Sequence, residues 1–306
     1  MDIELSKEES DFCKGIALIF ITLSHLPRVM GGGGNALNPL GYFGVAVFLF
    51  LSGYGLRKSY DKVGLKGFWG KRIKRIIPPL CIITIAISII CYVLKDKRFN
   101  PIDIILGCVG LSNVINPVTW YIGLMWYCYL VYWICMKRRI RSELIIGGSI
   151  LVLSVLFGNT SVNMWGLNAF SFSAGLYGAE KAKKTYNKQS FFEASVLLFI
   201  VSFVLYYFVG GNSNWLIIRN PVKSLIALLF LNCFFSFVEF GKKLIAKDLM
   251  VKRLGNISYE AFMIHAVFIW YFPELFSTFA KPIALMFFVA VTLGLSEILH
   301  SLMSRL

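Results

Sequence analysis

Lys14 and His25 are the two residues whose types and spacing point most directly to chemistry. They lie eleven positions apart in an apolar segment that begins at Asp11. In a helix, eleven residues make about three turns, so both side chains share one face, about 16 Å apart along the axis, with Asp11 and Thr22 in the same arc. Ionisable side chains are costly inside a membrane and are usually functional there, although a histidine hydrogen-bonded between helices is the structural alternative.

The composition predicts an integral membrane protein with several spans. Of the 306 residues, 57% are hydrophobic and 15% are charged, whereas about a quarter of the residues in a soluble domain are charged. The chain has a net charge of +15. Basic residues in a membrane protein usually mark its cytoplasmic loops, so we assign the surplus to such loops and expect no nucleic-acid partner. The seven cysteines have no metal-like spacing, which predicts packing residues and no metal site.

Apolar runs of the right length predict the individual helices. A helix crosses the hydrocarbon core in about 20 residues, and the runs between charged, Gly, Pro or Asn breaks predict an all-α polytopic membrane protein with about ten transmembrane helices. Residues 101–114 are apolar but too short to span, which fits an interfacial or re-entrant segment. The ten predicted spans are 12–29, 40–57, 76–94, 117–136, 143–159, 163–179, 191–210, 221–240, 256–275 and 281–302.

Loop charge predicts how these spans are oriented. The connections after the second, fourth, sixth and eighth spans carry the basic clusters, and the alternate connections carry few basic residues. Because cytoplasmic loops are enriched in Lys and Arg, both termini are predicted to be cytoplasmic. Lys14 then lies at the inner end of the first span and His25 in its outer half. Since the outer loops are short, we expect residues 1–306 to form a single transmembrane domain.

A second set of candidate residues lies where the third span begins. The stretch from Phe68 to Pro79 contains Lys71, Arg72 and Arg75. A basic cluster of this kind is commonly a stop-transfer signal at the inner membrane surface. However, Arg72 and Arg75 lie three residues apart on one helical face, and paired guanidinium groups suit a polyphosphate ligand because each binds phosphate oxygens in a fork.

The other two histidines have weaker signals. His265 lies well inside the ninth predicted span, where a structural and a functional role have equal weight. His300 lies near the inner end of the last span, three residues from Glu297, and this spacing favours a structural pair on one helix.

These motifs occur together and in the same order in one family, the membrane-bound acyltransferase family 3, which the sequence resembles over nearly its whole length. The family signature begins with an Arg or Lys that ten residues separate from a histidine, and in this sequence Lys14 rather than Arg stands before His25. The matching blocks are Asp11-x-x-Lys14-Gly with His25, Gly44-Val-x-x-Phe48-x-x-Leu51-Ser52-Gly53-Tyr54, Phe68-Trp69-x-x-Arg72-x-x-Arg75-Ile-x-Pro78, Trp120-Tyr121-Ile-Gly-Leu, and Leu254-Gly255 through Tyr259 to His265.

The resemblance implies an enzyme of the bacterial cytoplasmic (inner) membrane that O-acylates, most often O-acetylates, a cell-envelope carbohydrate. Acyl-CoA, most often acetyl-CoA, would be the cytoplasmic donor. His25 would be the catalytic residue, with Lys14 and Asp11 beside it. The remaining expected contacts are Arg72, Arg75, Lys71, Ser52 and Tyr54 for the donor, and Trp120, Tyr121, Glu260 and His265 for the carbohydrate acceptor.

Several alternatives stay open at this point. His25 could act as general base for direct attack or could carry the acyl group covalently. Lys14 could pair with Asp11 or face the phosphates of the donor. A rival class is an ion-coupled transporter with buried charges at Lys14, His25, Glu260 and His265, and a third is a non-catalytic partner of a polysaccharide assembly machine. The glycan, the choice between acetyl and succinyl, and the oligomeric state are not specified by the sequence.

Overall fold

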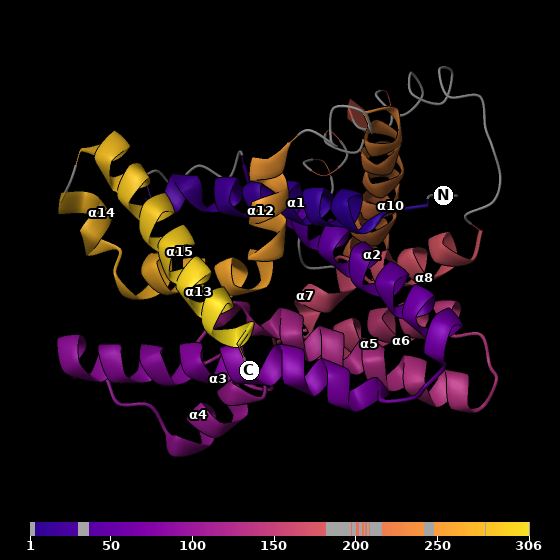
Figure 1. The fold of residues 1–306 in the computed structure, drawn as a ribbon, viewed down its shortest axis with the longest axis horizontal. Helices are drawn as coiled ribbons and strands as arrows, with labels where there is room; N and C mark the ends of the chain where they lie inside the picture. Colours follow the sequence, from indigo (N-terminus) through magenta and orange to yellow (C-terminus); the bar gives the residue numbers. More distant parts are fainter. Residues whose placement is uncertain are drawn as a thin grey trace. The chain divides into compact units, whose positions relative to one another are not determined.

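The computed structural model describes residues 4–29, 37–181, 216–241, 248–278 and 280–305, together with single positions between 197 and 208. Within these residues every regular element is a helix and none is a strand, which confirms the all-helical prediction (Figure 1). The elements are α1 Lys7–Val29, α2 Asn38–Val63, α3 Phe68–Lys95, α4 Pro101–Cys108, the 3-10 helix η1 Pro117–Thr119, α5 Trp120–Lys137, α6 Glu143–Leu156, α7 Asn163–Gly166, α8 Ser171–Lys181, α10 Leu216–Phe240, α12 Leu249–Asn256, α13 Ser258–Tyr271, α14 Glu274–Thr278 and α15 Lys281–Met303.

Five helical stretches among the described residues are long and apolar enough to cross a membrane, namely α2, α3, η1 with α5, α10 and α15. The chain is therefore a multi-pass membrane protein. The count of ten spans and the cytoplasmic position of both termini stay predictions. Most of the predicted span 191–210 lies outside the described residues.

Two of the predicted spans are interrupted in the structure. The predicted span 163–179 is divided into the short helix α7 and the longer α8, with a turn at residues 167–170. The predicted span 256–275 becomes α13, which ends at Tyr271 and is followed by the separate α14. The second break falls two residues before Pro273, and the residue before a proline is disfavoured in a helix.

The described residues divide into two compact units. The first unit comprises residues 1–21, 39–66 and 127–256, and the second comprises 22–38, 67–126 and 257–306. The unbroken helix α1 contributes its first part to one unit and the part from Thr22 onward to the other. The assignment of residues 1–306 to a single domain stays a prediction.

The first unit is packed tightly around α2. A Cβ atom at Gly53 would lie 2.1 Å from the carbonyl oxygen of Phe172, and one at Gly175 would lie 2.0 Å from that of Phe50. Only glycine allows the backbones of α2 and α8 to approach this closely, as expected for small residues between membrane helices. Phe50, which supplies one of these carbonyl oxygens, is fully buried.

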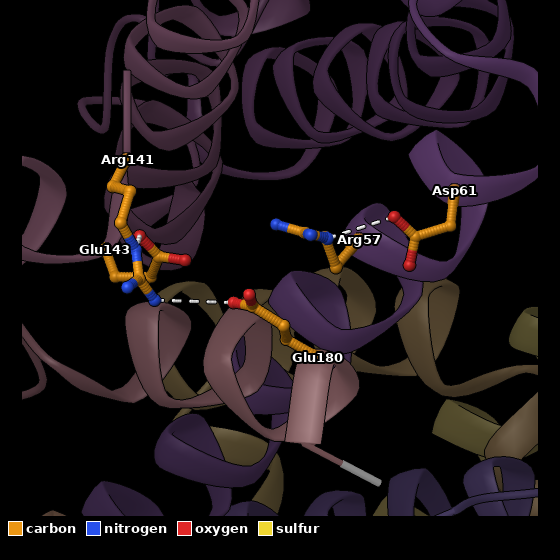
Figure 2. Close-up of polar contacts among 5 residues, drawn as sticks. All are labelled: Arg57, Asp61, Arg141, Glu143 and Glu180. Carbon is orange, nitrogen blue, oxygen red and sulfur yellow. Dashed lines mark hydrogen bonds and ion pairs between the residues drawn. The ribbon is translucent and has the colours of Figure 1, made fainter. Parts of the chain in front are cut away.

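Charged residues meet where three helices of the first unit reach one end (Figure 2). Arg57 pairs with Asp61 on α2 at 3.0 Å, and Arg141, in the connection after α5, pairs with Glu180 on α8 at 3.4 Å. Glu143, the first residue of α6, lies 3.8 Å from Arg141. These residues lie in or beside the connections after the second, fourth and sixth predicted spans. The positive charge of these connections is the basis for predicting that they are cytoplasmic.

The second unit is built on α3, α13 and α15, and specific hydrogen bonds fix α13 at its start and in its middle. The Tyr259 hydroxyl donates to the carbonyl oxygen of Ile76 on α3 at 2.9 Å. The buried Asn116 amide donates to the carbonyl oxygen of Met263 at 3.0 Å. In Figure 1, α13 and α15 lie side by side in orange and yellow.

Helix α3 contains two consecutive prolines, Pro78 and Pro79, one helical turn after its basic residues. Because proline has no amide hydrogen, the carbonyl groups of Lys74 and Arg75 have no helical donor four residues ahead. The basic end of α3 and its apolar remainder are thus separated by a weak point in the hydrogen-bond ladder.

Candidate functional site

Helix α1 carries all three residues expected at the catalytic centre. Lys14 Nζ and Asp11 Oδ1 form an ion pair at 2.8 Å, one helical turn apart. Asp11 is 7% exposed, so its carboxylate depends on this partner, because a buried unpaired charge is costly. Of the two predicted roles of Lys14, pairing with Asp11 is therefore the one present in the structure.

A close backbone contact holds this end of α1 against α12 within the first unit. A Cβ atom at Gly255 would lie 1.7 Å from the carbonyl oxygen of Asp11, and one at Gly15 would lie 2.1 Å from that of Val251. The position of Asp11 is therefore set by the absence of a side chain at Gly255.

An ion pair at the surface strengthens the same helix contact. Lys252 Nζ lies 2.7 Å from Glu8 Oε2. The hydrogen bond and the positive charge of Lys252 hold the pKa of the Glu8 carboxyl below its ordinary value. Sequence reasoning did not find this pair, since 244 positions separate the two residues.

At the other end of α1, His25 lies among aromatic rings of α13 in the second unit. Its ring centroid is 5.2 Å from that of His265 and 5.4 Å from that of Trp270, whose ring it meets edge to face. The guanidinium of Arg28 lies 4.9 Å from the centre of the Trp270 ring, a cation–π contact. The structure thus brings two of the predicted site residues, His25 and His265, together.

His265 has one ring nitrogen with a partner and one without. Its ring is 0% exposed, and Nδ1 lies 3.3 Å from the carbonyl oxygen of Ala261. A carbonyl oxygen only accepts hydrogen bonds, so Nδ1 must carry the proton, and in the neutral ring Nε2 is then an acceptor. Among the described residues Nε2 has no hydrogen-bond partner, although buried polar atoms nearly always have one. This nitrogen is suited to accept from a donor that enters the site or from the neighbouring imidazole.

The predicted donor-binding cations lie in the first two turns of α3. Arg72 is partly buried, donates to the carbonyl oxygen of Phe68 and lies 3.7 Å from the centre of the Phe68 ring. Lys71 and Arg75 are exposed. Gly67, with a φ of 65°, precedes the first turn. The N-terminus of a helix carries partial positive charge, so the dipole and the side chains attract anions at the same place.

Ser52 and Tyr54, the other two predicted donor contacts, lie on α2 in the first unit. Tyr54 is 6% exposed, and its hydroxyl accepts a hydrogen bond from the Leu5 amide at 2.9 Å. Tyr54 therefore belongs to the core of this unit, and its hydroxyl holds the segment that precedes α1. Ser52 is partly buried.

Two of the predicted acceptor contacts are linked to His265 through rings of the second unit. Trp120 is half-buried and meets Tyr121 edge to face at 6.3 Å. Tyr121 in turn meets Phe262 at 5.3 Å, and Phe262 lies 5.6 Å from His265. The family block at the start of α5 and the block on α13 are thus parts of one aromatic layer.

Glu260, the remaining predicted acceptor contact, is buried and faces α15. Its Oε1 lies 3.0 Å from His300 Nδ1, and its Oε2 has no hydrogen-bond partner among the residues described. The sequence suggested Glu297 as the partner of His300, because three residues separate them on one helix. The structure adds the Glu260 contact, which spacing within a single helix cannot reveal.

Comparison with known proteins agrees with this arrangement. The model of the family 3 acyltransferase domain matches residues 7–300. Proteins of Staphylococcus aureus strains COL and N315, each named “Putative O-acetyltransferase”, are 31% identical to the chain over 122 residues. That alignment covers 37% of this chain and 18% of each relative's length. No solved structure matches the chain. Since the family model covers nearly all of the sequence, the predicted family is confirmed, and the chain belongs to the membrane-bound acyltransferase family 3.

Proposed function

We propose that the chain transfers an acetyl group from acetyl-CoA, bound at the cytoplasmic face, to a hydroxyl group of an envelope carbohydrate at the outer face of the bacterial cytoplasmic membrane. The observation that carries this proposal is the His25–His265 contact. His265 is fully buried, and its Nε2 has no hydrogen-bond partner among the described residues. The ring that faces it is that of His25, the histidine of the family signature.

The positions of the two ends of α3 support a donor on the cytoplasmic side. Arg72 and Arg75 are near its start, and an apolar span of more than 18 residues separates them from Lys95 at its end. The basic end offers guanidinium groups and a helix N-terminus, which together suit the adenosine phosphates of CoA. The pantetheine arm would carry the thioester from there toward the outer half of the membrane, where the predicted orientation puts His25.

The chemistry that His25 would supply is proton transfer. The sugar oxygen attacks the thioester carbonyl carbon, the new C–O bond forms as the C–S bond breaks, and His25 takes the hydroxyl proton and returns it to the departing CoA sulfur. His265 would accept a hydrogen bond at Nε2 from one ring nitrogen of His25, which leaves the other nitrogen free to act as base. His265 is then a positioning residue. In the covalent version His25 would first attack the thioester itself.

The test uses inverted membrane vesicles supplied with radiolabelled acetyl-CoA, with label in envelope glycan as the product. His25→Ala is expected to lower transfer at least 100-fold. Arg72→Gln is expected to raise the KM for acetyl-CoA about tenfold, since it removes a charge-assisted contact with phosphate. Arg141→Gln, which removes an exposed arginine of the first unit, is the matched control and should leave both constants unchanged.

Two results would contradict this assignment. One is full transfer by the His25→Ala variant. The other is uptake of an unmodified solute by wild-type vesicles without CoA, which would identify a transporter instead. Acid-quenched single turnovers without acceptor then separate the two mechanisms, because only the covalent route leaves labelled acetyl on the protein.

A further inference from the structure

The C-terminal end of α3 carries cations that lie against aromatic rings. Lys97 Nζ lies 5.0 Å from the ring centre of Phe99 and 4.9 Å from that of Tyr271. The guanidinium of Arg98 lies 5.3 Å from the ring centre of Tyr92. These five residues, all in the second unit, are called the Lys97 patch below.

The two cations of the patch are available to a ligand. Lys95, just before them, is paired with Glu274 at 2.5 Å, and the hydrogen bond from Lys95 lowers the pKa of the Glu274 carboxyl. In the described part of the chain, neither Lys97 nor Arg98 is paired with a carboxylate. Both are exposed, and so is Asp96 between Lys95 and Lys97. A ligand with several negative charges would supply the missing partners.

The patch is preorganised at its centre. Tyr271 is 7% exposed, and its hydroxyl donates to the carbonyl oxygen of Ile115 at 2.6 Å. Asp96 ends α3 in the left-handed conformation, with a φ of 47°, so the chain turns sharply before Lys97. A fixed ring and a fixed turn lower the entropy that a ligand must overcome when it binds.

The Lys97 patch and His25 contact consecutive residues of α13. Trp270, which meets His25 edge to face at 5.4 Å, directly precedes Tyr271. A chain-like ligand on the patch could therefore continue past Trp270 toward His25. Trp270 also holds Arg28 over its ring, which adds a third cation on the same route.

Cations and aromatic rings at a membrane surface also serve as lipid anchors, but two observations favour a glycan. Lys and Arg are normally enriched at the cytoplasmic surface, whereas this end of α3 lies opposite the basic end that would bind the donor. The patch also leads to His25, where an acceptor must arrive. Aromatic faces stack on the apolar faces of sugar rings, and lysine and arginine pair with carboxylate or phosphate groups.

We propose that the Lys97 patch binds the acceptor and that the acceptor is an acidic glycan, a sugar chain that carries carboxylate or phosphate groups. This inference rests on the proposed acetyl transfer and adds the chemical class of its substrate. Charge pairing at Lys97 and Arg98 selects the chain, and the exposed rings of Tyr92 and Trp270 contact its sugar rings.

The first experiment locates the product. Cells lacking the gene are complemented with the wild-type or a variant gene, and their envelope glycans are separated by anion exchange into acidic and neutral fractions. Acetate released by mild base is measured in each fraction. We expect His25-dependent acetate in the acidic fraction. His25-dependent acetate in the neutral fraction alone would overturn the acidic acceptor, whereas no His25-dependent acetate in either fraction would refute the acetyl transfer itself.

The second experiment measures initial rates with the purified acidic fraction and the protein in phosphatidylcholine proteoliposomes. Lys97→Gln with Arg98→Gln should raise the KM for this glycan about tenfold and leave the KM for acetyl-CoA unchanged. Asp96→Asn, which removes a negative charge and keeps a residue that tolerates the left-handed conformation, should lower the KM for the glycan. Lys281→Gln, an exposed lysine at the start of α15, is the control and should change neither constant.

The variants also separate a glycan site from a lipid anchor. An unchanged KM for the acidic glycan in the double variant would overturn the proposal. The same holds if the double variant loses activity only when phosphatidylglycerol is added to the vesicles, since the patch would then bind lipid headgroups. A change of equal size in the KM for acetyl-CoA would indicate general damage and would also overturn it.

Discussion

At one end of α1 charged side chains and backbone contacts hold the helix, whereas at the other end the contacts are between rings. Asp11 and Lys14 form an ion pair beside the glycine contact with α12. His25 instead contacts His265 and Trp270 of α13. The first end of α1 is thus held in place by an ion pair and a backbone contact, whereas the second end places the His25 imidazole against the rings of α13. The predictions below test this contrast.

The largest effect is expected from Gly255→Ala. Its methyl group would lie 1.7 Å from the carbonyl oxygen of Asp11, so α1 and α12 would have to separate. Overpacking of this kind costs about 3 kcal/mol, and the variant should lose both thermal stability in detergent and acetyl transfer. Gly148→Ala is the matched control, because nothing lies within 4 Å of its new Cβ atom. Equal stability of the two variants would show that the glycine contact does not fix this end of α1.

The next largest effect is expected at His265. His265→Phe keeps the ring but removes the acceptor nitrogen, so kcat should fall about 100-fold while the KM for acetyl-CoA changes little. His265→Gln restores an acceptor and should recover part of the rate. If both variants lost activity equally, the role of His265 would be packing alone. Rates at several pH values should also differ in shape between wild-type and His265→Phe, which a packing role would not produce.

A smaller effect is expected from Lys14→Met. It leaves the Asp11 carboxylate, only 7% exposed, without its partner, and we expect about a tenfold loss of transfer, or about 1.4 kcal/mol. Lys14→Arg keeps the charge and should retain activity. Complete loss in the arginine variant would mean that the site requires the ammonium group of lysine itself.

The smallest effect is expected from Glu8→Gln, which removes the surface ion pair with Lys252. Because the pKa of Glu8 is lowered in the folded protein, its stabilising contribution is complete above the ordinary value of 4.5 and is lost as the pH falls through the lowered value. The wild-type protein should therefore melt slightly above Glu8→Gln at pH 7, and the two should converge in acid. A difference that grew on acidification would contradict the pairing.

Hydropathy predicted the helical character of the described residues but not where the helices begin and end. The apolar run predicted a helix over residues 76–94, whereas α3 begins at Phe68. Hydropathy detects only the apolar part of a helix. The basic residues Lys71, Arg72 and Arg75 belong to the same helix but lie before that part. The predicted span 163–179 is wrong as a single helix. The mean hydropathy taken over that whole stretch gives no sign of the turn between α7 and α8.

The sequence proposed the candidate site residue by residue but not as an arrangement. Spacing on one helix was sufficient for Lys14 and His25, because helical geometry fixes neighbours up to a few turns apart. The contact of His25 with His265 depends on packing between residues 240 positions apart. The same is true of Gly255 against Asp11. Such contacts are set by tertiary structure, and a single sequence contains no periodic signal for them.

The two prolines of α3 have a mechanical consequence. Without two amide hydrogens, the helix is most easily bent between Arg75 and Leu80. The basic segment can therefore bend relative to the apolar span that follows it. Such a hinge would let the proposed donor-binding end of α3 move without disturbing the Lys97 patch at the other end.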